Sequence, residues 1–151
     1  MNQKDLLTHL DQRAVVAAIE SAEAACSGEI RVHIEPNLHG REVRWLAERT
    51  FERLGMTRTA LRNGILIFLA AKEQQFAVIG DRGIHEKVGD SFWEEVAAHL
   101  VEHFRKSEFT EGVVQAIEEV GSQLAAHFPH AGKSDRNELS DEISVGEPPR
   151  S

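Results

Sequence analysis

Residues 63–80 read NGILIFLAAKEQQFAVIG, two apolar runs separated by the three polar residues Lys72-Glu73-Gln74. The first run, Ile65 to Ala71, is short, rich in β-branched residues and preceded by the turn pair Asn63-Gly64, which predicts a strand covered on both faces. The second run, residues 75–79, follows too closely for a parallel return, because such a return needs a crossover of about a dozen residues or more. The sequence therefore predicts an antiparallel hairpin whose first strand is buried on both faces.

A strand and a helix precede this hairpin. Residues 29–35 alternate polar and apolar side chains, which predicts a strand with one buried face and one solvent-exposed face. Between Arg41 and Leu54, apolar side chains recur at helical spacing, and Gly55 ends the pattern. A strand, a helix and a second strand in this order predict a right-handed crossover that makes the two strands parallel.

Three further helices are expected, over residues 8–26, 93–104 and 109–128, each with one apolar face. The order α-β-α-β-β-α-α predicts an α/β fold, a three-layer α/β/α sandwich. Its small mixed sheet would hold one βαβ crossover and one hairpin, with helices on both faces. Residues 131–151 are poor in apolar side chains. We therefore expect a disordered polar tail after a domain spanning residues 1–130.

Composition excludes several classes of function. The 151-residue chain has 17 Lys and Arg against 25 Asp and Glu, a net charge of −8. Such a surface repels phosphate backbones, so nucleic acid is not an expected partner. No apolar run approaches the ~20 residues of a membrane span, so direct membrane insertion is not expected. The N-terminus shows no secretory signal, and the single cysteine, Cys26, forms no internal disulfide. A cytoplasmic protein is the expectation.

One end of the predicted sheet collects polar side chains. If the first two strands are parallel and the third returns beside the second, then Glu29, Asn63 and Asp81 lie close together. Carboxylate and amide oxygens are the ligands that Ca²⁺ and Mg²⁺ prefer, so these three residues form a candidate metal site. A structural role is the alternative, because Asn-Gly and Gly-Asp are common turn pairs and Asp81 could cap the next helix. No nucleophile accompanied by a base is visible, so catalytic residues stay unassigned.

A second pattern, His99-Leu100-Val101-Glu102-His103, matches the H-x-x-E-H signature of inverted zinc peptidases. At about 100° per residue, Glu102 points away from the apolar face of its helix and His99 lies well off that face. The pattern therefore predicts a solvated helix flank rather than a peptidase site.

The residues of the candidate metal site belong to an ordered series of short segments. These are Ser27-Gly28-Glu29-Ile30-Arg31-Val32, Arg62-Asn63-Gly64 with the strand that follows, Ile79-Gly80-Asp81-Arg82-Gly83-Ile84, and Phe109-x-x-Gly112 leading to His127-Phe128-Pro129. From about residue 5 to residue 130, the series resembles the TPM domain family. The resemblance implies an α/β/α sandwich, a bound divalent cation in some members, usually calcium, and the acid phosphatase activity of a chloroplast thylakoid member. It places conserved loop positions of the family on Asn63 and Gly80-Asp81, with Glu29 at the start of the first strand.

The chain also departs from common family members. It resembles the short, soluble type, without the N-terminal signal and the C-terminal membrane anchor, and Arg62 stands where many members carry Asp. The resemblance thus implies a divalent-cation-binding module, for Ca²⁺ rather than Mg²⁺, with weak phosphomonoesterase activity. The alternative is a non-catalytic protein-interaction or regulatory domain. A membrane-anchored relative or another protein is the expected partner.

Overall fold

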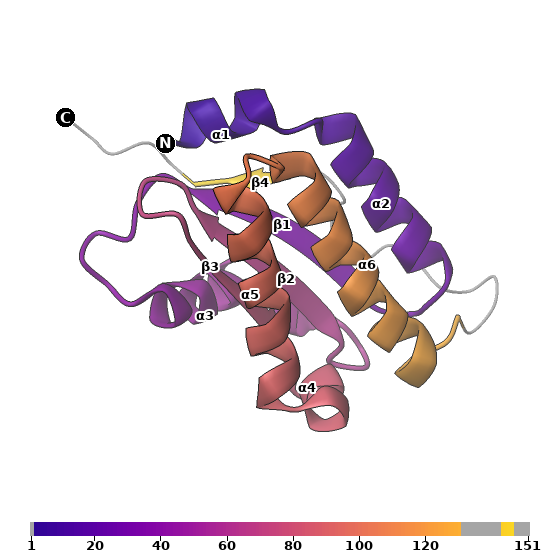
Figure 1. Cartoon of the computed structure of the whole chain (residues 1–151). Helices are drawn as coiled ribbons and strands as arrows, with labels where there is room; N and C mark the ends of the chain where they lie inside the picture. The colour runs from indigo at the N-terminus through magenta and orange to yellow at the C-terminus, as the bar shows by residue number, and fades with distance from the viewer. Residues whose placement is uncertain (1, 131–142, 147–151) are drawn as a thin grey trace.

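A computed structural model describes residues 2–130 and 143–146 of the chain (Figure 1). Its elements, in chain order, are α1 (Gln3–His9), α2 (Gln12–Ala24), β1 (Glu29–Glu35), α3 (Val43–Arg53), η1 (Met56–Arg58), β2 (Gly64–Ala70), β3 (Gln75–Gly80), α4 (Arg82–Val88), α5 (Asp90–Arg105), α6 (Phe109–His127) and β4 (Ser144–Val145).

The four strands form one mixed sheet in the order β3-β2-β1-β4. Strands β1 and β2 are parallel, with Glu29 opposite Gly64, and β2 and β3 are antiparallel, with Ile65 opposite Gly80. The predicted crossover through α3 and the predicted hairpin are both confirmed.

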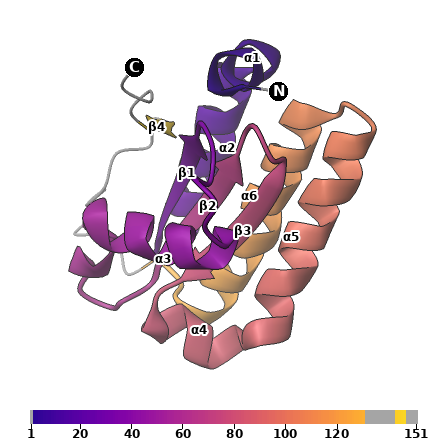
Figure 2. The same cartoon turned by 90° about the vertical axis from the view of Figure 1, so that its left-hand side faces the viewer.

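Helices cover both faces of this sheet, with α3 on one side and α5 and α6 on the other (Figure 2). All seven residues of β2 are buried, and they alternate between two apolar cores. Ile65, Ile67 and Leu69 belong to the larger core, which includes side chains of α1, α2, α5 and α6. Leu66, Phe68 and Ala70 belong to the smaller core under α3. The predicted α/β sandwich is therefore confirmed.

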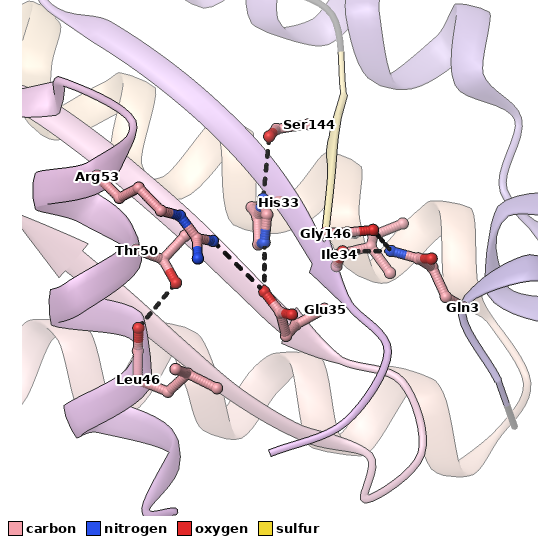
Figure 3. Close-up of polar contacts among 9 residues, drawn as sticks. All are labelled: Gln3, His33, Ile34, Glu35, Leu46, Thr50, Arg53, Ser144 and Gly146. Carbon is pink, nitrogen blue, oxygen red and sulfur yellow. Dashed lines mark hydrogen bonds and ion pairs between the residues drawn. The ribbon is translucent and has the colours of Figure 1, made fainter. Parts of the chain in front are cut away.

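The expected solvent-exposed face of β1 is wrong, because three of its four polar side chains are buried and Arg31 is partly buried. Glu29, His33 and Glu35 are 3%, 1% and 8% exposed. His33 stacks on Phe68 with ring centroids 5.6 Å apart, and its Nε2 lies 2.8 Å from Glu35 Oε1 (Figure 3). Arg53 of α3 approaches the same carboxylate, with Nη2 3.8 Å from Oε1. These contacts pair His33 with Glu35 away from water, whereas Glu29 Oε2, at the other end of the strand, is buried and accepts no hydrogen bond from the described residues.

Two further differences concern the chain ends. The helix expected over residues 8–26 is two helices, because Leu10 is extended and the Asp11 side chain caps α2 by accepting a hydrogen bond from Ala14 N. Most of the predicted tail lies outside the described residues. Within it, residues 143–146 are described and include β4, which pairs parallel to β1 at His33 and Ile34. A two-residue strand is too short to produce a periodic pattern, so it was not predicted.

Candidate functional site

The starts of β1 and β2 and the end of β3 meet at one end of the sheet, here called the Asp81 end. Glu29 lies opposite Gly64, and Asp81 N donates a hydrogen bond to Gly64 O at 2.9 Å. Glu29, Asn63 and Asp81 are 3%, 1% and 6% exposed. The sequence argument therefore placed all three residues at the correct end of the sheet.

Two glycines give this end its shape. A Cβ at Gly80 would lie 2.2 Å from the Trp93 ring, and a Cβ at Gly83 would lie 2.3 Å from Leu61 O. Gly83 N also donates to Arg62 O at 2.8 Å, which holds the start of α4 against the turn before β2. The Gly-Asp-x-Gly segment is thus fixed by close packing on both sides of Asp81.

The Asp81 carboxylate is bound on both oxygens by Arg62. Arg62 Nε donates to Oδ2 at 2.6 Å and Arg62 Nη2 donates to Oδ1 at 2.9 Å. Asp81 Oδ1 also accepts from Arg82 N at 2.8 Å and so caps α4. The hydrogen bond to Asp81, with the attraction of its charge, raises the pKa of the Arg62 guanidinium above its ordinary value. The capping role considered for Asp81 is observed, and Arg62 is the partner that the sequence analysis missed.

A hollow of about 320 Å³ opens beside this ion pair, a volume near the lower limit for small-ligand sites. Its lining residues include Arg44, Glu48, Glu52, Thr57, Arg62, Asp81, Arg82, His85 and Trp93. Trp93 Nε1 donates to His85 Nδ1 at 2.9 Å, so the neutral His85 ring carries its proton on Nε2. The hollow therefore offers cationic donors, carboxylate acceptors and one oriented imidazole.

Asn63 and Glu29 do not line the hollow. Asn63 N donates to Thr59 Oγ1 at 3.1 Å and its Nδ2 donates to Ser27 Oγ at 3.4 Å. Asn63 Oδ1 is buried and, among the residues that the structure describes, accepts no hydrogen bond. Across residues 2–130 and 143–146, no three His, Cys, Asp or Glu side chains are grouped so that they could hold a metal ion. The structure thus brings the three predicted ligands to one end of the sheet but places only Asp81 at the hollow.

The H-x-x-E-H pattern on α5 makes contacts with α6 and with the loop before it. His99 Nδ1 lies 2.8 Å from Glu119 Oε1, and His103 Nε2 lies 2.6 Å from Gln115 Oε1. Glu102 is exposed, as expected, whereas both histidines are partly buried. The expected solvated flank agrees with Glu102 and with His99, whose side chain is 40% exposed. The rings of His99 and His103 also form hydrogen bonds across the helix pair.

Comparison with known proteins identifies the family. The TPM domain matches residues 1–123, and the chain belongs to this family. The structure is similar to the BA42 protein from the psychrophilic bacterium Bizionia argentinensis, with 39% identity, a TM-score of 0.80, and coverage of 89% of this chain and 92% of that chain.

Two more distant structures share the fold alone. One is the N-terminal domain of a P. gingivalis protein, with 16% identity, a TM-score of 0.61 and coverage of 76% of this chain and 75% of that chain. The other is the N-terminal domain of the cg2496 protein from Corynebacterium glutamicum, with 16% identity, a TM-score of 0.58 and coverage of 92% and 79%. No curated protein matches the chain. Among the described residues, none of the helices combines the length and the apolar character needed to cross a bilayer.

Proposed function

We propose that the protein is a divalent-cation-binding TPM module that takes Ca²⁺ in preference to Mg²⁺ at the Asp81 end of the sheet. The observation that carries this proposal is a carboxylate, 6% exposed, on the wall of a hollow large enough for a small ligand. Asn63 Oδ1 supports it, because this buried amide oxygen accepts no hydrogen bond from the described residues and can serve as an oxygen ligand. The oxygen-only chemistry of Asp81, Asn63 and Glu29 fits a hard cation.

Cation binding at Asp81 requires the ion pair with Arg62 to break, because Arg62 holds both carboxylate oxygens of Asp81. Asp81 becomes a ligand only when Arg62 releases it. Glu29 and Asn63 lie at the same end of the sheet, outside the lining of the hollow, and we propose them as the further ligands. We therefore expect weak affinity, with Arg62 as the internal competitor.

Weak phosphomonoesterase activity is the catalytic part of the proposal. Arg44, Arg62 and Arg82 line the hollow and supply guanidinium groups suited to a phosphate. His85 also lines the hollow, with its Nε2 3.6 Å from Asp90 Oδ1, and is the candidate general acid. A bound cation would polarise a phosphate oxygen. We expect slow turnover, because none of the described residues that line the hollow is a nucleophile hydrogen-bonded to a base.

Thermal unfolding with and without CaCl₂ tests the cation site. At ten times Kd, binding to the folded state adds about 1.4 kcal/mol, which raises Tm by about 3–6 °C for a chain of this size. Asp81→Asn should abolish this rise. Asp90→Asn is the matched control, because Asp90 neighbours His85 but its side chain is 70% exposed. An equal calcium-induced rise in the Asp81→Asn variant would remove Asp81 from the site.

The second candidate is a non-catalytic interaction domain that acts in the cytoplasm, with a membrane-anchored relative or another protein as partner. The Arg62–Asp81 ion pair favours it, because a neutralised carboxylate needs no metal. The two candidates differ in phosphomonoester hydrolysis after chelation and readdition of metal. Phosphomonoester hydrolysis that is unchanged by the chelator and by Asp81→Asn does not come from the proposed metal site. That result would support the interaction domain.

A further inference from the structure

The segment that contains α3 has a net positive charge, although the chain as a whole is acidic. Residues 41–62 hold six arginines and three glutamates, a net charge of +3 in a chain of net charge −8. α3 covers one side of the sheet, while α5 and α6 cover the other (Figure 2). Four of the six arginines are exposed on or just before α3, namely Arg41, Arg44, Arg49 and Arg53. The outward face of α3 is therefore a cationic surface on an acidic molecule.

Trp45 lies in the middle of this cationic surface. The residue is 40% exposed, although tryptophan is among the largest apolar side chains. Arg41 Cζ lies 4.9 Å from the centroid of the indole ring, and Arg49 Cζ lies 5.1 Å from it. Tryptophan and arginine are the residue types that most often dominate the binding energy of protein interfaces. An accessible indole ring with two guanidinium groups therefore has the composition of an interaction site.

Arg41 and Arg49 differ from a neighbouring arginine in the partner that they contact. Arg44 Nε lies 3.1 Å from Glu48 Oε1, a conventional ion pair along the helix. Among the residues that the structure describes, Arg41 and Arg49 form no ion pair with a carboxylate, and both lie over the Trp45 ring. A guanidinium stacked on an aromatic ring keeps its in-plane N–H donors available for a carboxylate. The two side chains are thus held in place to receive carboxylates from another molecule.

We propose that Arg41, Trp45 and Arg49 form a docking site for an acidic segment of a partner protein. Both guanidinium carbons lie close to the same ring centroid, so they are at most about 10 Å apart. In an extended segment, side chains two residues apart lie on one face at a spacing of about 6.6 Å. An extended sequence with two acidic residues separated by one other residue therefore fits the pair of arginines. This site is separate from the proposed cation site and does not depend on it.

A narrow acidic peptide fits this surface better than an anionic bilayer does. Glu42, Glu48 and Glu52 are also exposed on this part of the chain. A flat anionic surface would approach these carboxylates together with the arginines, and their repulsion acts within the Debye length of about 8 Å. A peptide can contact the two guanidinium groups alone, and its charge directs it away from the acidic remainder of the molecule.

Peptide titration followed by NMR tests the docking site. The probe is the synthetic peptide acetyl-Glu-Ser-Glu-Ser-Glu-amide, and its control is the same peptide with Gln in place of each Glu. Each peptide is added to the isotope-labelled full chain. We expect the Glu peptide to shift the Nε–Hε signals of Arg41 and Arg49 and the indole N–H signal of Trp45, with weaker binding as salt is added. The Gln peptide should leave these signals unchanged.

Variants at exposed positions separate the site from the net charge of the chain. Arg41→Gln and Arg49→Gln should each weaken binding of the Glu peptide about fivefold or more. Trp45→Leu keeps every charge but removes the ring that positions both arginines, so it should weaken binding about threefold or more. Arg13→Gln is the matched control, because it removes the same charge from an exposed position of α2, a helix that packs on the other side of the sheet. Its affinity should stay within about twofold of the wild type.

Three other results would each overturn the proposal. Equal binding of the Glu and Gln peptides, or equal weakening by Arg13→Gln and Arg41→Gln, would show that no specific site exists. Binding to vesicles of phosphatidylcholine and phosphatidylglycerol that is lost on combining Arg41→Gln with Arg49→Gln, without any effect of the peptide, would assign the surface to a membrane. Self-association in sedimentation experiments that is lost in the same double variant would assign it to a second copy of the chain.

Discussion

At the scale of single residues, position 83 shows how the backbone dictates the sequence around Asp81. A Cβ there would lie 2.3 Å from Leu61 O and 2.6 Å from Arg62 O, both backbone atoms. Backbone cannot move aside as the end of a flexible side chain can. Glycine at this position is therefore required by the contact between the start of α4 and the turn before β2.

Gly83→Ala should accordingly destabilise the protein. We expect a loss of about 1–3 kcal/mol, the usual range for overpacking, measured as a lower midpoint in urea unfolding. Glu86→Ala, at an exposed position of the same helix, is the control and should stay within about 0.5 kcal/mol of the wild type. A Gly83→Ala variant as stable as the control would show that the turn yields easily.

The sequence predicted the position of Asp81 but not its ion-pair partner, Arg62. The turn chemistry of Gly80-Asp81 placed Asp81 at the end of a strand, because glycine and aspartate favour turns. The ion pair joins residues 19 positions apart, and charge patterning does not reveal such a contact. One signal could have found it. The hairpin register places Gly80 opposite Ile65, so the chain just beyond Gly80 lies near the residues before Gly64.

At the scale of elements, β4 is a short strand held by specific contacts (Figure 3). Ser144 Oγ lies 3.0 Å from His33 Nδ1, and Gly146 N donates to Ile34 O at 2.9 Å. Gln3 Nε2 donates to Ile34 O at 2.9 Å and to Gly146 O at 3.0 Å, which ties α1 to the same place. These hydrogen bonds to β1 and α1, rather than the length of the strand, therefore stabilise β4.

Gly146→Val should release β4 from the sheet. A Cβ at this position would lie 2.7 Å from Glu35 Oε2, and Glu35 cannot move freely because it also contacts His33 and Arg53. A loss of about 1 kcal/mol would accelerate amide hydrogen exchange at position 146 about fivefold. Val145→Ala is the control, because Val145 is 46% exposed. Unchanged exchange in Gly146→Val would mean that Glu35 yields without breaking its contacts.

Helices and strands with a long apolar pattern in the sequence were predicted correctly, and features without such a pattern were missed. The helix over residues 41–54 and the strands β2 and β3 were predicted because each has a sustained apolar pattern. The break between α1 and α2 was missed, because apolar spacing continues through Leu10 while the backbone there is extended. The burial of His33 was missed because alternation alone describes a half-exposed strand, and the cover comes from residues distant in sequence.

At the scale of the whole molecule, β2 connects two cores of unequal size. Ile67 belongs to the core beneath α2, α5 and α6, and its neighbour Phe68 belongs to the core beneath α3. This arrangement was predictable, because an unbroken apolar strand needs cover on both faces and crossovers are right-handed. Neither core can lose β2 without exposing the apolar side chains of the other.

The two cores should therefore unfold together, and the two tryptophans can report on them separately. Trp45 lies on α3, and Trp93 lies on α5 on the other side of the sheet. In Trp93→Phe, fluorescence reports on Trp45 alone, and in Trp45→Phe, it reports on Trp93 alone. Within each variant, we expect the urea midpoint from fluorescence to coincide with that from far-UV circular dichroism, the mark of a two-state transition. The urea midpoint of Trp93→Phe should be lower than that of Trp45→Phe, because Trp93→Phe also loses the hydrogen bond to His85. An earlier fluorescence transition for Trp45 would instead show that α3 detaches from a sheet still covered by α5 and α6.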